Sequence, residues 1–415
     1  MLYIDSGTAE RPIPMVGGSR AWTDSKWSSA IVVPLRAENG ERVLRLISSL
    51  RAALEFQKPE FPTLLVLVLN SLKSKLEAEA LLNQELRQTL SGLKDLNFDI
   101  VLLDHAHEGR SFNEKSGVGL ARKIGCDFAA DLIKSGQVRD SWIRCTDADA
   151  QVSHNYLSEI PVKSGALIYP FRHSFDAQNP AQARAALLYD AYLRYLRLGM
   201  VAARSTFAYH SIGSLIAVHA DSYRVARGFP DYQAGEDFYF LNKIRKLAPV
   251  QWCGDVDPVI LEGRISNRVP FGTGRSIIKI LSEGENSWSF YHPESFRILG
   301  QALEALQESR GVFSREKSPE FYDFCQSRKM IEKFANIARQ CKSPAQWQSR
   351  CLELFDGFEQ MKFLHYLRDH GHPALNWGQA ASESWFLESK IRQFSGDLAG
   401  WQQSLVALDE STPFV

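Results

Sequence analysis

Short apolar runs alternate with amphipathic stretches between residues 29 and 145, and this alternation constrains the fold more strongly than any other feature of the sequence. The apolar runs span residues 29–35, 64–69, 98–103 and 141–145. The stretches between them place apolar side chains at helical spacing over residues 41–56, 72–90 and 115–133. Strands that alternate with helices predict an α/β sheet with right-handed crossovers. The run 64–69 is apolar on both faces, as expected of a strand covered by helices on both sides.

The alternation stops after residue 169. The segments that follow are a helix at 180–203, whose tyrosine-rich stripe we expect to pack on the sheet, a strand at 214–219, a helix from 235, and edge strands within 250–261. Residues 265–274 form a loop rich in turn formers. Nearly all of 276–415 has amphipathic helical spacing. We therefore expect three parts: an N-terminal arm (1–28), an α/β domain (29–275) and a helical C-terminal domain (276–415).

Charge and cysteine content narrow the class of protein. The 48 basic residues balance 48 acidic ones, so no net field draws the chain to nucleic acid or anionic lipid. The six cysteines form no Cys-X-X-Cys pair, which argues against a zinc or dithiol site. The longest apolar run is too short to cross a bilayer, and residues 1–27 lack an apolar segment of signal-peptide type. We expect a cytoplasmic protein with no transmembrane segment and no nucleic-acid partner.

Polar side chains stand at the carboxyl ends of the expected strands. They are Arg36, Glu38, Asn70, Asp104, Asp147 and Asp149. Ligands of open α/β sheets bind outside these strand ends, where Glu38 and Asn70 could contact a base or a ribose. Asp147 and Asp149 are separated by one alanine and directly follow an apolar run. Two carboxylates so placed suit Mg²⁺ or Mn²⁺, which would also hold a diphosphate.

Basic residues and glycines in the same region indicate phosphate binding. Arg36, Lys115 and Arg122 could meet phosphate oxygens. Gly117 and Gly119 stand just before a helix, where backbone amides can approach a phosphate. The structural alternatives are close helix–strand packing for the glycines and a solvated loop charge for Lys115. The segment is neither a Rossmann fingerprint, because a third glycine is missing, nor a P-loop.

A second acidic segment, Gly235-Glu236-Asp237, begins an expected helix. A carboxylate near a bound cation and diphosphate can act as a general base toward an acceptor hydroxyl. The alternative is structural, because acidic residues in a first turn complement the helix dipole. These residues alone leave both interpretations open.

Three segments, taken in order, resemble family 2 glycosyltransferases with the GT-A fold. They are Ile31-Val32-Val33-Pro34, Asp147-Ala148-Asp149 and Gly235-Glu236-Asp237. The segments that precede the last one, Gly213-Ser214 and Arg227-Gly228-Phe229-Pro230, also resemble that family. The resemblance covers residues 29–261. It implies a nucleoside-diphosphate-sugar donor, Mn²⁺ or Mg²⁺, and inversion at the anomeric carbon. The expected fold class is α/β: a GT-A-like domain with a Rossmann-like, mostly parallel sheet, and an all-helical C-terminal extension.

The resemblance also implies roles for individual residues. Asp149 would bind the metal, Asp147 would bind the metal or the ribose, and Asp237, beside Glu236, would be the catalytic base. The residues that would line the donor pocket are Pro34, Arg36 and Glu38. Asn70 and Asp104 would lie near the nucleotide base.

The sequence departs from the family pattern in several features. Asn70 stands where an aspartate is common, and both the Gln-X-X-Arg-Trp signature and the membrane helices of processive polymer synthases are absent. We therefore expect a single transfer rather than polymer synthesis. Arg264, Arg268 and the loop 269–274 are candidates to cover the diphosphate in place of that signature.

Two alternatives to a glycosyltransferase stay open. A nucleotidyltransferase uses a related sheet and metal, but usually needs a glycine-rich basic loop after the first strand, where residues 35–40 contain Arg36 as their one basic residue. A catalytically silent scaffold would instead bind a partner through the helical extension, which is also compatible with a homo-oligomer. The sequence does not distinguish a small molecule, a glycan or a lipid-linked molecule as the acceptor.

Overall fold

The computed structural model describes residues 2–4, 26–266, 272–309, 314–394 and 396–413. The chain divides into two compact units. The first comprises Met1–Ser174, Ser211–Glu262 and Asn267–Gly272, and the second comprises Phe175–His210, Gly263–Ser266 and Thr273–Val415. The chain therefore passes between the two units several times.

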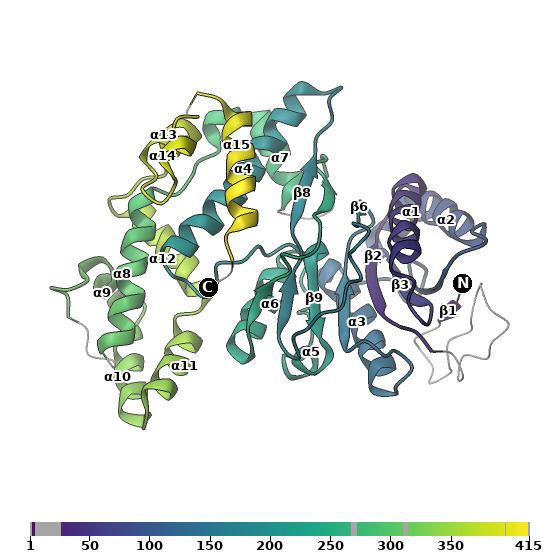
Figure 1. Cartoon of the computed structure of the whole chain (residues 1–415), viewed down its shortest axis with the longest axis horizontal. Helices are drawn as coiled ribbons and strands as arrows, with labels where there is room; N and C mark the ends of the chain where they lie inside the picture. Colours follow the sequence, from purple (N-terminus) through teal and green to yellow (C-terminus); the bar gives the residue numbers. More distant parts are fainter. Residues whose placement is uncertain (1, 5–25, 267–271, 310–313, 395, 414–415) are drawn as a thin grey trace. The chain divides into compact units, whose positions relative to one another are not determined.

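An eight-stranded sheet forms the centre of the first unit (Figure 1). Its strands in spatial order are β1 (Leu2–Ile4), β4 (Phe98–His105), β3 (Thr63–Asn70), β2 (Ala30–Leu35), β5 (Trp142–Cys145), β9 (Ile216–His219), β7 (Ala166–Ile168) and β10 (Val250–Trp252). β9 is antiparallel to both of its neighbours, whereas the other described pairs are parallel. A smaller sheet joins β6 (Ala150–Gln151), β11 (Val259–Glu262) and β8 (Phe171–Ser174).

The chain reverses its direction of travel across the sheet between β2 and β5. From β2 it moves through β3 to β4, with α1 (Gly40–Gln57) and α2 (Leu76–Ser91) as crossovers, and it returns through α3 (Val118–Lys134) to β5. Right-handed crossovers place α1 and α2 on one face of the sheet and α3 on the other. Figure 1 shows α1 and α2 side by side, with α3 apart from them. The crevice outside the strand ends at such a reversal is the usual ligand site of α/β sheets.

Local signals explain where these elements begin and how closely they pack. The side chain of Asn39 accepts a hydrogen bond from the backbone N–H of Glu41 (2.8 Å) and caps α1. On α3, a Cβ at Gly125 would lie 2.4 Å from Cγ1 of Val32, so glycine lets this helix approach the sheet closely. β3 is buried along its whole length, which agrees with its doubly apolar run.

The remaining elements of the first unit connect and flank its sheets. They are the short 3₁₀ turns η2 (Lys73–Lys75) and η3 (Gly213–Leu215) and the helices α5 (Ala220–Val225) and α6 (Glu236–Leu247). α6 begins at the second acidic segment, as its sequence pattern predicts.

Helices build the second unit. They are α4 (Pro180–Ala202), α7 (Thr273–Glu283), η4 (Glu285–Ser287), α8 (Pro293–Ser309), α9 (Pro319–Ser327), α10 (Met330–Gln340), α11 (Pro344–Leu354), α12 (Gly357–Asp369), α13 (Trp377–Glu383), α14 (Ser389–Arg392) and α15 (Leu398–Ser411). α4 groups here, although the sequence pattern predicts that it packs on the sheet. The ring of Tyr195 on α4 lies 5.8 Å from that of Phe296 and 6.2 Å from that of Trp401. The tyrosine stripe therefore finds its apolar partners on the C-terminal helices, because spacing predicts an apolar face but not what covers it.

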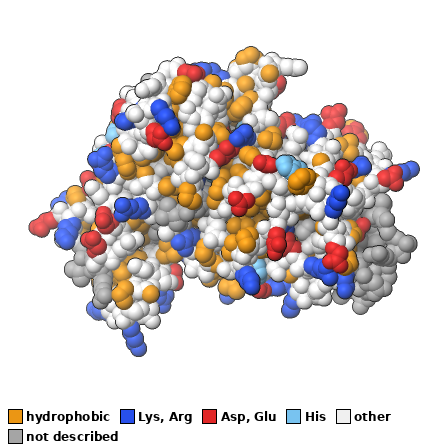
Figure 2. Space-filling model, in the orientation of Figure 1, with side chains coloured by type: hydrophobic (Ala, Val, Ile, Leu, Met, Phe, Trp, Pro, Cys, Tyr) orange, Lys and Arg blue, Asp and Glu red, His pale blue; other side chains and the backbone are white. Residues whose placement is uncertain are grey.

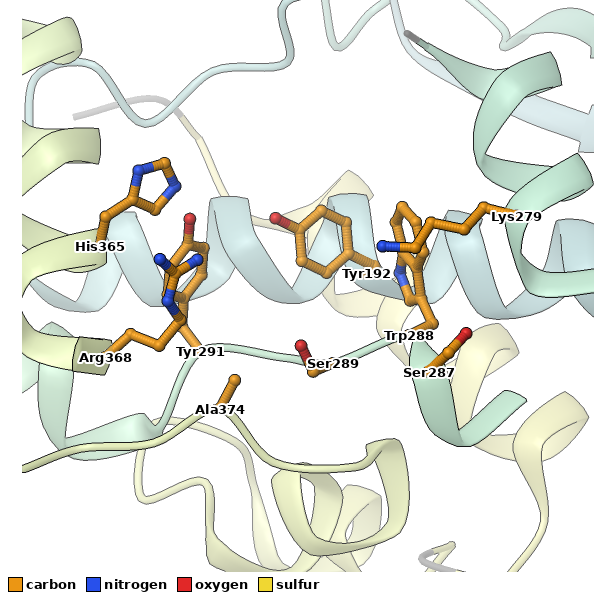
Figure 3. A pocket seen from close by; sticks show the side chains of 9 residues that line it. All are labelled: Tyr192, Lys279, Ser287, Trp288, Ser289, Tyr291, His365, Arg368 and Ala374. Carbon is orange, nitrogen blue, oxygen red and sulfur yellow. The ribbon is translucent and has the colours of Figure 1, made fainter. Parts of the chain in front are cut away.

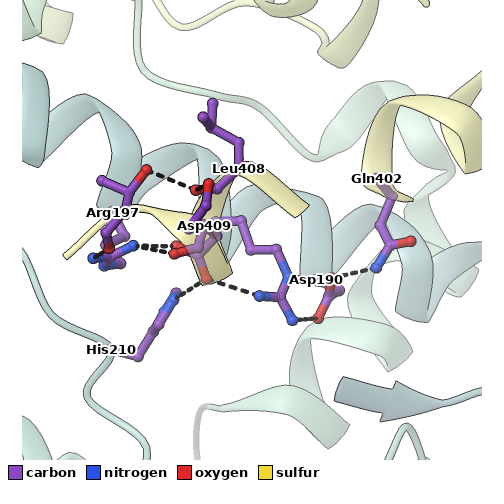
Figure 4. A network of polar contacts seen from close by, with 9 residues as sticks. Asp190, Arg197, His210, Gln402, Leu408 and Asp409 are labelled. Atoms are coloured by element: carbon purple, nitrogen blue, oxygen red, sulfur yellow. Dashed lines mark hydrogen bonds and ion pairs between the residues drawn. The ribbon is translucent and has the colours of Figure 1, made fainter. Parts of the chain in front are cut away.

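A buried charged network joins α4 to α15. The carboxylate of Asp409 accepts hydrogen bonds from Nη1 of Arg194 (2.8 Å) and Nη1 of Arg197 (2.7 Å), and Nε2 of His210 lies 2.9 Å from it (Figure 4). Asp190 accepts a further bond from Nε of Arg194 (2.9 Å). Burial by itself would raise the pKa of Asp409, but His210 and the two arginines hold it well below its usual range. The network anchors the last helix of the chain to a helix far earlier in the sequence.

The expected fold class is confirmed. The first unit is an α/β domain with a mostly parallel sheet, and the elements after residue 272 that the structure describes are all helices. On the face shown in Figure 2, basic and acidic side chains are interspersed, in line with the balanced charge. Among the described residues, no helix combines the length and the apolar character needed to cross a bilayer.

Candidate functional site

The Asp147-Ala148-Asp149 segment forms a turn at the carboxyl end of β5, beside the end of β2. β2 and β5 pair in parallel, and the backbone N–H of Thr146 donates to the carbonyl of Val32 (3.1 Å). Ala148 is buried, whereas Asp147 and Asp149 are both partly exposed. The two carboxylates therefore lie at the reversal of strand order, where ligands of α/β sheets bind.

A buried arginine from α3 connects the two acidic segments. Arg122 donates from Nε to Glu236 Oε1 (2.9 Å) and from Nη2 to Asp147 Oδ1 (2.9 Å), and its side chain is 4% exposed. Burial by itself would lower the pKa of Arg122, but the carboxylates of Asp147 and Glu236 keep it raised. Gly213 makes room for the guanidinium, since a Cβ there would lie 2.4 Å from Nη2. Two segments far apart in the sequence thus belong to one site.

Asp237 follows Glu236 in the first turn of α6 and shares this site. Gly235 precedes the helix with a φ of 74°, a conformation that favours glycine. Burial and then the charge of Glu236 raise the pKa of Asp237 to about 7, against the lowering effect of Arg122. A carboxyl group with this pKa can accept a proton near neutral pH, as a general base must. The same acids also complement the dipole of α6.

A second charged group lies at the start of α1 and the end of β11. Arg42 donates to both carboxylate oxygens of Glu262 (2.8 and 3.1 Å), and Arg45 reaches the same carboxylate (3.3 Å). The hydrogen bond to Glu262 raises the pKa of Arg42, and the charges of Glu38 and Asp149 raise it further. The predicted site residues Glu38 and Asp149 therefore both interact electrostatically with Arg42. Glu38 follows β2, and Asp149 follows β5.

Two predicted contacts of the base hydrogen-bond within the protein. Asn70 is buried and donates to the backbone carbonyl of Leu35 (2.8 Å). Asp104 is buried and accepts two hydrogen bonds from Arg87 (2.7 and 3.1 Å). These bonds order the strand ends, and contact of either side chain with a nucleotide stays a prediction.

The predicted pocket residues on the first strand and the loop before α3 differ in exposure. Pro34 is partly exposed near the end of β2. Arg36 pairs with Glu79 (3.0 Å), so part of its charge is offset. Lys115 is exposed in the loop before α3. Phosphate contacts of Arg36 and Lys115 stay predictions.

Close backbone packing explains the glycines at the start of α3. A Cβ at Gly117 would lie 2.6 Å from Cα of Gln233, and one at Gly119 would lie 2.3 Å from the carbonyl oxygen of Pro230. The backbone N–H of Gly119 donates to the carbonyl of Tyr232 (3.1 Å). The packing alternative therefore accounts for both glycines, although the partner is the 230–233 segment rather than a strand. A role of Gly117 in donor binding is not needed to explain its presence.

The candidate metal ligands come from one turn. Among the residues that the structure describes, no three Asp, Glu, His or Cys side chains are placed to share a metal ion. Mg²⁺ is commonly held by one or two carboxylates and completes its shell with substrate phosphates and water, so Asp147 and Asp149 fit that pattern. The predicted diphosphate contact Arg268 lies outside the described residues.

Sequence reasoning missed two contacts that build the site. Arg122 is expected from the sequence to meet phosphate, but in the structure it bridges Glu236 and Asp147. The pairing of Arg42 with Glu262 is not predicted at all. The one available signal is position, because Arg42 lies in the first turn of α1, the helix that follows β2.

Comparison with known proteins identifies fold neighbours only. The sequence matches no known family model and no curated protein. The structure is similar to residues 1–349 of TarS from S. aureus, with a TM-score of 0.36, 13% identity, and coverage of 92% of this chain and 90% of that one. It is also similar to the mannosyltransferase PcManGT from Pyrobaculum calidifontis, solved with GDP-Man and Mn²⁺ (TM-score 0.33, 11% identity, 94% and 90% covered).

A third neighbour is the catalytic domain of Drosophila β1,4-galactosyltransferase 7 (TM-score 0.32, 13% identity, 56% of this chain and 67% of that one covered). All of these TM-scores and identities are low. The fold class of this chain therefore rests on its own strand order and register.

Proposed function

We propose that this protein is a glycosyltransferase that moves one sugar from a nucleoside-diphosphate donor to an acceptor hydroxyl, with inversion, as its resemblance to family 2 implies. The observation that carries the proposal is the double hydrogen bond of Arg122, which brings Asp147 of the first acidic segment and Glu236 of the second into one site. A donor-binding segment and a base-bearing segment must meet in this way for a single transfer reaction.

The donor would lie across the strand ends at the β2–β5 reversal. Pro34 lies near the end of β2 and Glu38 follows that strand, while Asp147 and Asp149 follow the neighbouring β5, so a nucleotide at these strand ends would reach both. Ligand binding outside the carboxyl ends at a reversal of strand order is the general rule for open α/β sheets. The charges of Glu38 and Asp149 both raise the pKa of Arg42. The two carboxylates therefore lie near one arginine, which supports placing the donor between them.

Asp149 and Asp147 would hold a divalent cation, Mn²⁺ or Mg²⁺. Both supply the hard oxygen ligands that these ions prefer. When bound, such a cation would neutralise charge on the departing diphosphate, a Lewis-acid contribution of several kcal/mol.

Asp237 would remove the proton from the acceptor hydroxyl. A general base works best with a pKa close to the working pH, and the pKa of Asp237 is raised to about 7 by burial and by Glu236. Arg122 opposes the rise of this pKa and so keeps the carboxylate available near neutral pH. The positioning residue Arg122 therefore couples the donor side of the site to the base.

We expect Asp237→Asn to keep donor binding and to lose turnover by about 10²–10⁴, the usual contribution of a general base. Turnover is measured as release of nucleoside diphosphate from a panel of nucleotide sugars with Mn²⁺, and donor binding as the rise in melting temperature that each nucleotide sugar gives.

A matched control is Asp221→Asn, because Asp221 also stands in the first turn of a helix but is 80% exposed and outside the site. Retained turnover in Asp237→Asn would remove Asp237 from the role of base. Release of pyrophosphate rather than nucleoside diphosphate would instead indicate a nucleotidyltransferase.

A further inference from the structure

The second unit contains a cavity that the proposed transfer reaction does not use. Its volume is about 220 Å³, and the side chains that define its chemistry are Tyr192, Lys279, Trp288, Tyr291, His365 and Arg368. They come from α4, α7, the segment after η4, and α12 (Figure 3). The volume is below the roughly 300–1,000 Å³ of pockets for drug-sized ligands, so it suits a single ring.

The walls of this cavity are aromatic, with one ring pair perpendicular and the other nearly parallel. The rings of Tyr192 and Trp288 lie 5.5 Å apart at 82°, and the imidazole of His365 lies 5.9 Å from the ring of Tyr291 at 25°. Aromatic faces attract the weakly positive C–H groups of an apolar ligand face. The perpendicular pair of Tyr192 and Trp288 leaves room for a puckered sugar ring that lies on one aromatic face and hydrogen-bonds at its edges.

Two cations mark the cavity as a site for negative charge. In Figure 3, the ammonium of Lys279 and the guanidinium of Arg368 approach the space around Tyr192 and Tyr291 from different sides. The lining given by the described residues holds no carboxylate. Arg368 donates to Asp369 outside the lining through Nε (2.8 Å) and Nη2 (3.0 Å), so its Nη1 edge is left for another acceptor. Guanidinium groups bind carboxylates and phosphates through such paired donors.

An unsatisfied donor in the cavity wall also indicates a missing acceptor. The indole N–H of Trp288 is buried and has no hydrogen-bond partner among the described residues. A buried donor left unpaired destabilises the folded state, and groups of this kind in folded proteins call for an explanation. A hydroxyl or an anionic oxygen brought by a ligand could accept from this indole.

We propose that this cavity binds one sugar ring that carries a carboxylate or a phosphate. The sugar face lies on an aromatic wall, its hydroxyls bond to the polar edges of the cavity, and its anionic group pairs with Arg368 and Lys279. The proposal goes beyond the transfer reaction and does not depend on the chemistry at Asp237.

Calorimetric titration of the full chain tests this site with four probes: D-glucuronate, D-glucose 6-phosphate, D-glucose and inorganic phosphate. At least one of the two anionic sugars should saturate the site at concentrations up to about 10 mM. Its affinity should be at least tenfold higher than that of glucose and that of inorganic phosphate. The anionic sugar that binds identifies the anionic group. Absence of saturation by both anionic sugars would overturn the proposal, and so would equally tight binding of glucose or of phosphate.

Two variants localise the binding. The double variant Lys279→Ala/Arg368→Ala removes two exposed cations. It should lower the affinity for the anionic sugar at least tenfold. Arg350→Ala is the matched control, because Arg350 is an exposed arginine on α11 that pairs with the nearby Glu353 (3.1 Å) and does not line the cavity. Equal affinity of the double variant and the control, with unchanged melting temperatures, would overturn the proposal.

A last variant separates this site from the catalytic one. Asp149→Asn alters the proposed metal site in the first unit, and it should leave binding of the anionic sugar unchanged. Loss of the binding in Asp149→Asn would place the sugar at the transferase site and overturn the inference. Loss of transfer activity alone would leave it standing, so the two proposals fail separately.

Discussion

At the scale of single residues, the candidate site depends on one buried positive charge that serves two acidic segments. Arg122 bonds to Glu236 and Asp147 at 2.9 Å each, and Glu236 is itself 3% exposed. Removing one partner of a buried ion pair usually destabilises a protein by about 3–5 kcal/mol, because the remaining charge stays buried. The arginine therefore contributes to stability and also tunes the acid beside it.

We expect Arg122→Gln to shift the pH dependence of turnover. Burial and Glu236 raise the pKa of Asp237 to about 7, so turnover in the parent should rise as the pH increases through about 7 and the base loses its proton. Arg122 opposes this rise of the pKa. Its removal should therefore raise the pKa of Asp237 further and move the rising limb to higher pH. The measurement is nucleoside diphosphate release between about pH 5 and 9 at saturating donor.

Two further variants make this test specific. Arg139→Gln removes a cation whose pair with Glu60 is exposed, and its pH profile should match the parent. Arg122→Lys keeps the charge with a different shape, and its profile should lie closer to the parent than that of Arg122→Gln. A rising limb that stays in place in Arg122→Gln would contradict the assigned coupling between Arg122 and Asp237.

At the scale of elements, α15 is held to α4 by buried charges as well as by apolar packing. Asp409 is fully buried between Arg194 and Arg197, with His210 at 2.9 Å. Asp409 is thus shared by two buried guanidinium groups, of which Arg194 also pairs with Asp190 (2.9 Å). The pKa of Asp409 is held low in the folded state, so its contribution to stability is present at neutral pH and is lost as the pH falls below about 4.

We expect Asp409→Asn to lower the free energy of unfolding by about 3–5 kcal/mol at pH 7, because it leaves two buried arginines without their shared carboxylate. Urea denaturation followed by circular dichroism measures this change. Glu353→Gln is the control, since Glu353 forms an exposed pair on α11 and exposed pairs contribute little. Equal stability of the two variants would show that the network in Figure 4 contributes no more than a surface pair.

At the scale of the whole molecule, the helical unit is not a simple C-terminal appendage. Its first helix, α4, lies between β8 and β9 in the sequence, so the chain leaves the α/β unit and returns to it. Leu188, Tyr195 and Leu198 of α4 are buried in the core of the helical unit. A division at residue 275, as the sequence pattern predicts, would therefore separate α4 from the helices that cover it.

We expect a chain truncated after residue 275 to aggregate or to lose cooperative unfolding, because the apolar face of α4 would be left in water. Exposed apolar patches of this kind favour association. Size-exclusion chromatography and thermal melting of the truncated chain measure the outcome. A soluble monomer that melts cooperatively near the temperature of the full chain would contradict the grouping of α4 with the C-terminal helices.

Sequence reasoning reached the local parts of this structure. β3 follows from its continuous apolar run, and α1 follows from the helical spacing of its apolar residues, while the start of α6 follows from its acidic segment. The order of Asp147-Ala148-Asp149 and Gly235-Glu236-Asp237 is likewise visible in one dimension. These features are local because backbone geometry fixes the spacing of residues on a strand or helix face.

Only the tertiary structure decided which distant groups meet. It placed Arg122 between Asp147 and Glu236, covered Tyr195 with the C-terminal helices, and packed Gly117 against Gln233. The physical reason is that an apolar stripe or a buried charge requires a partner without specifying one. The path of the chain through space determines that partner, and the spacing of residues along the sequence does not predict it.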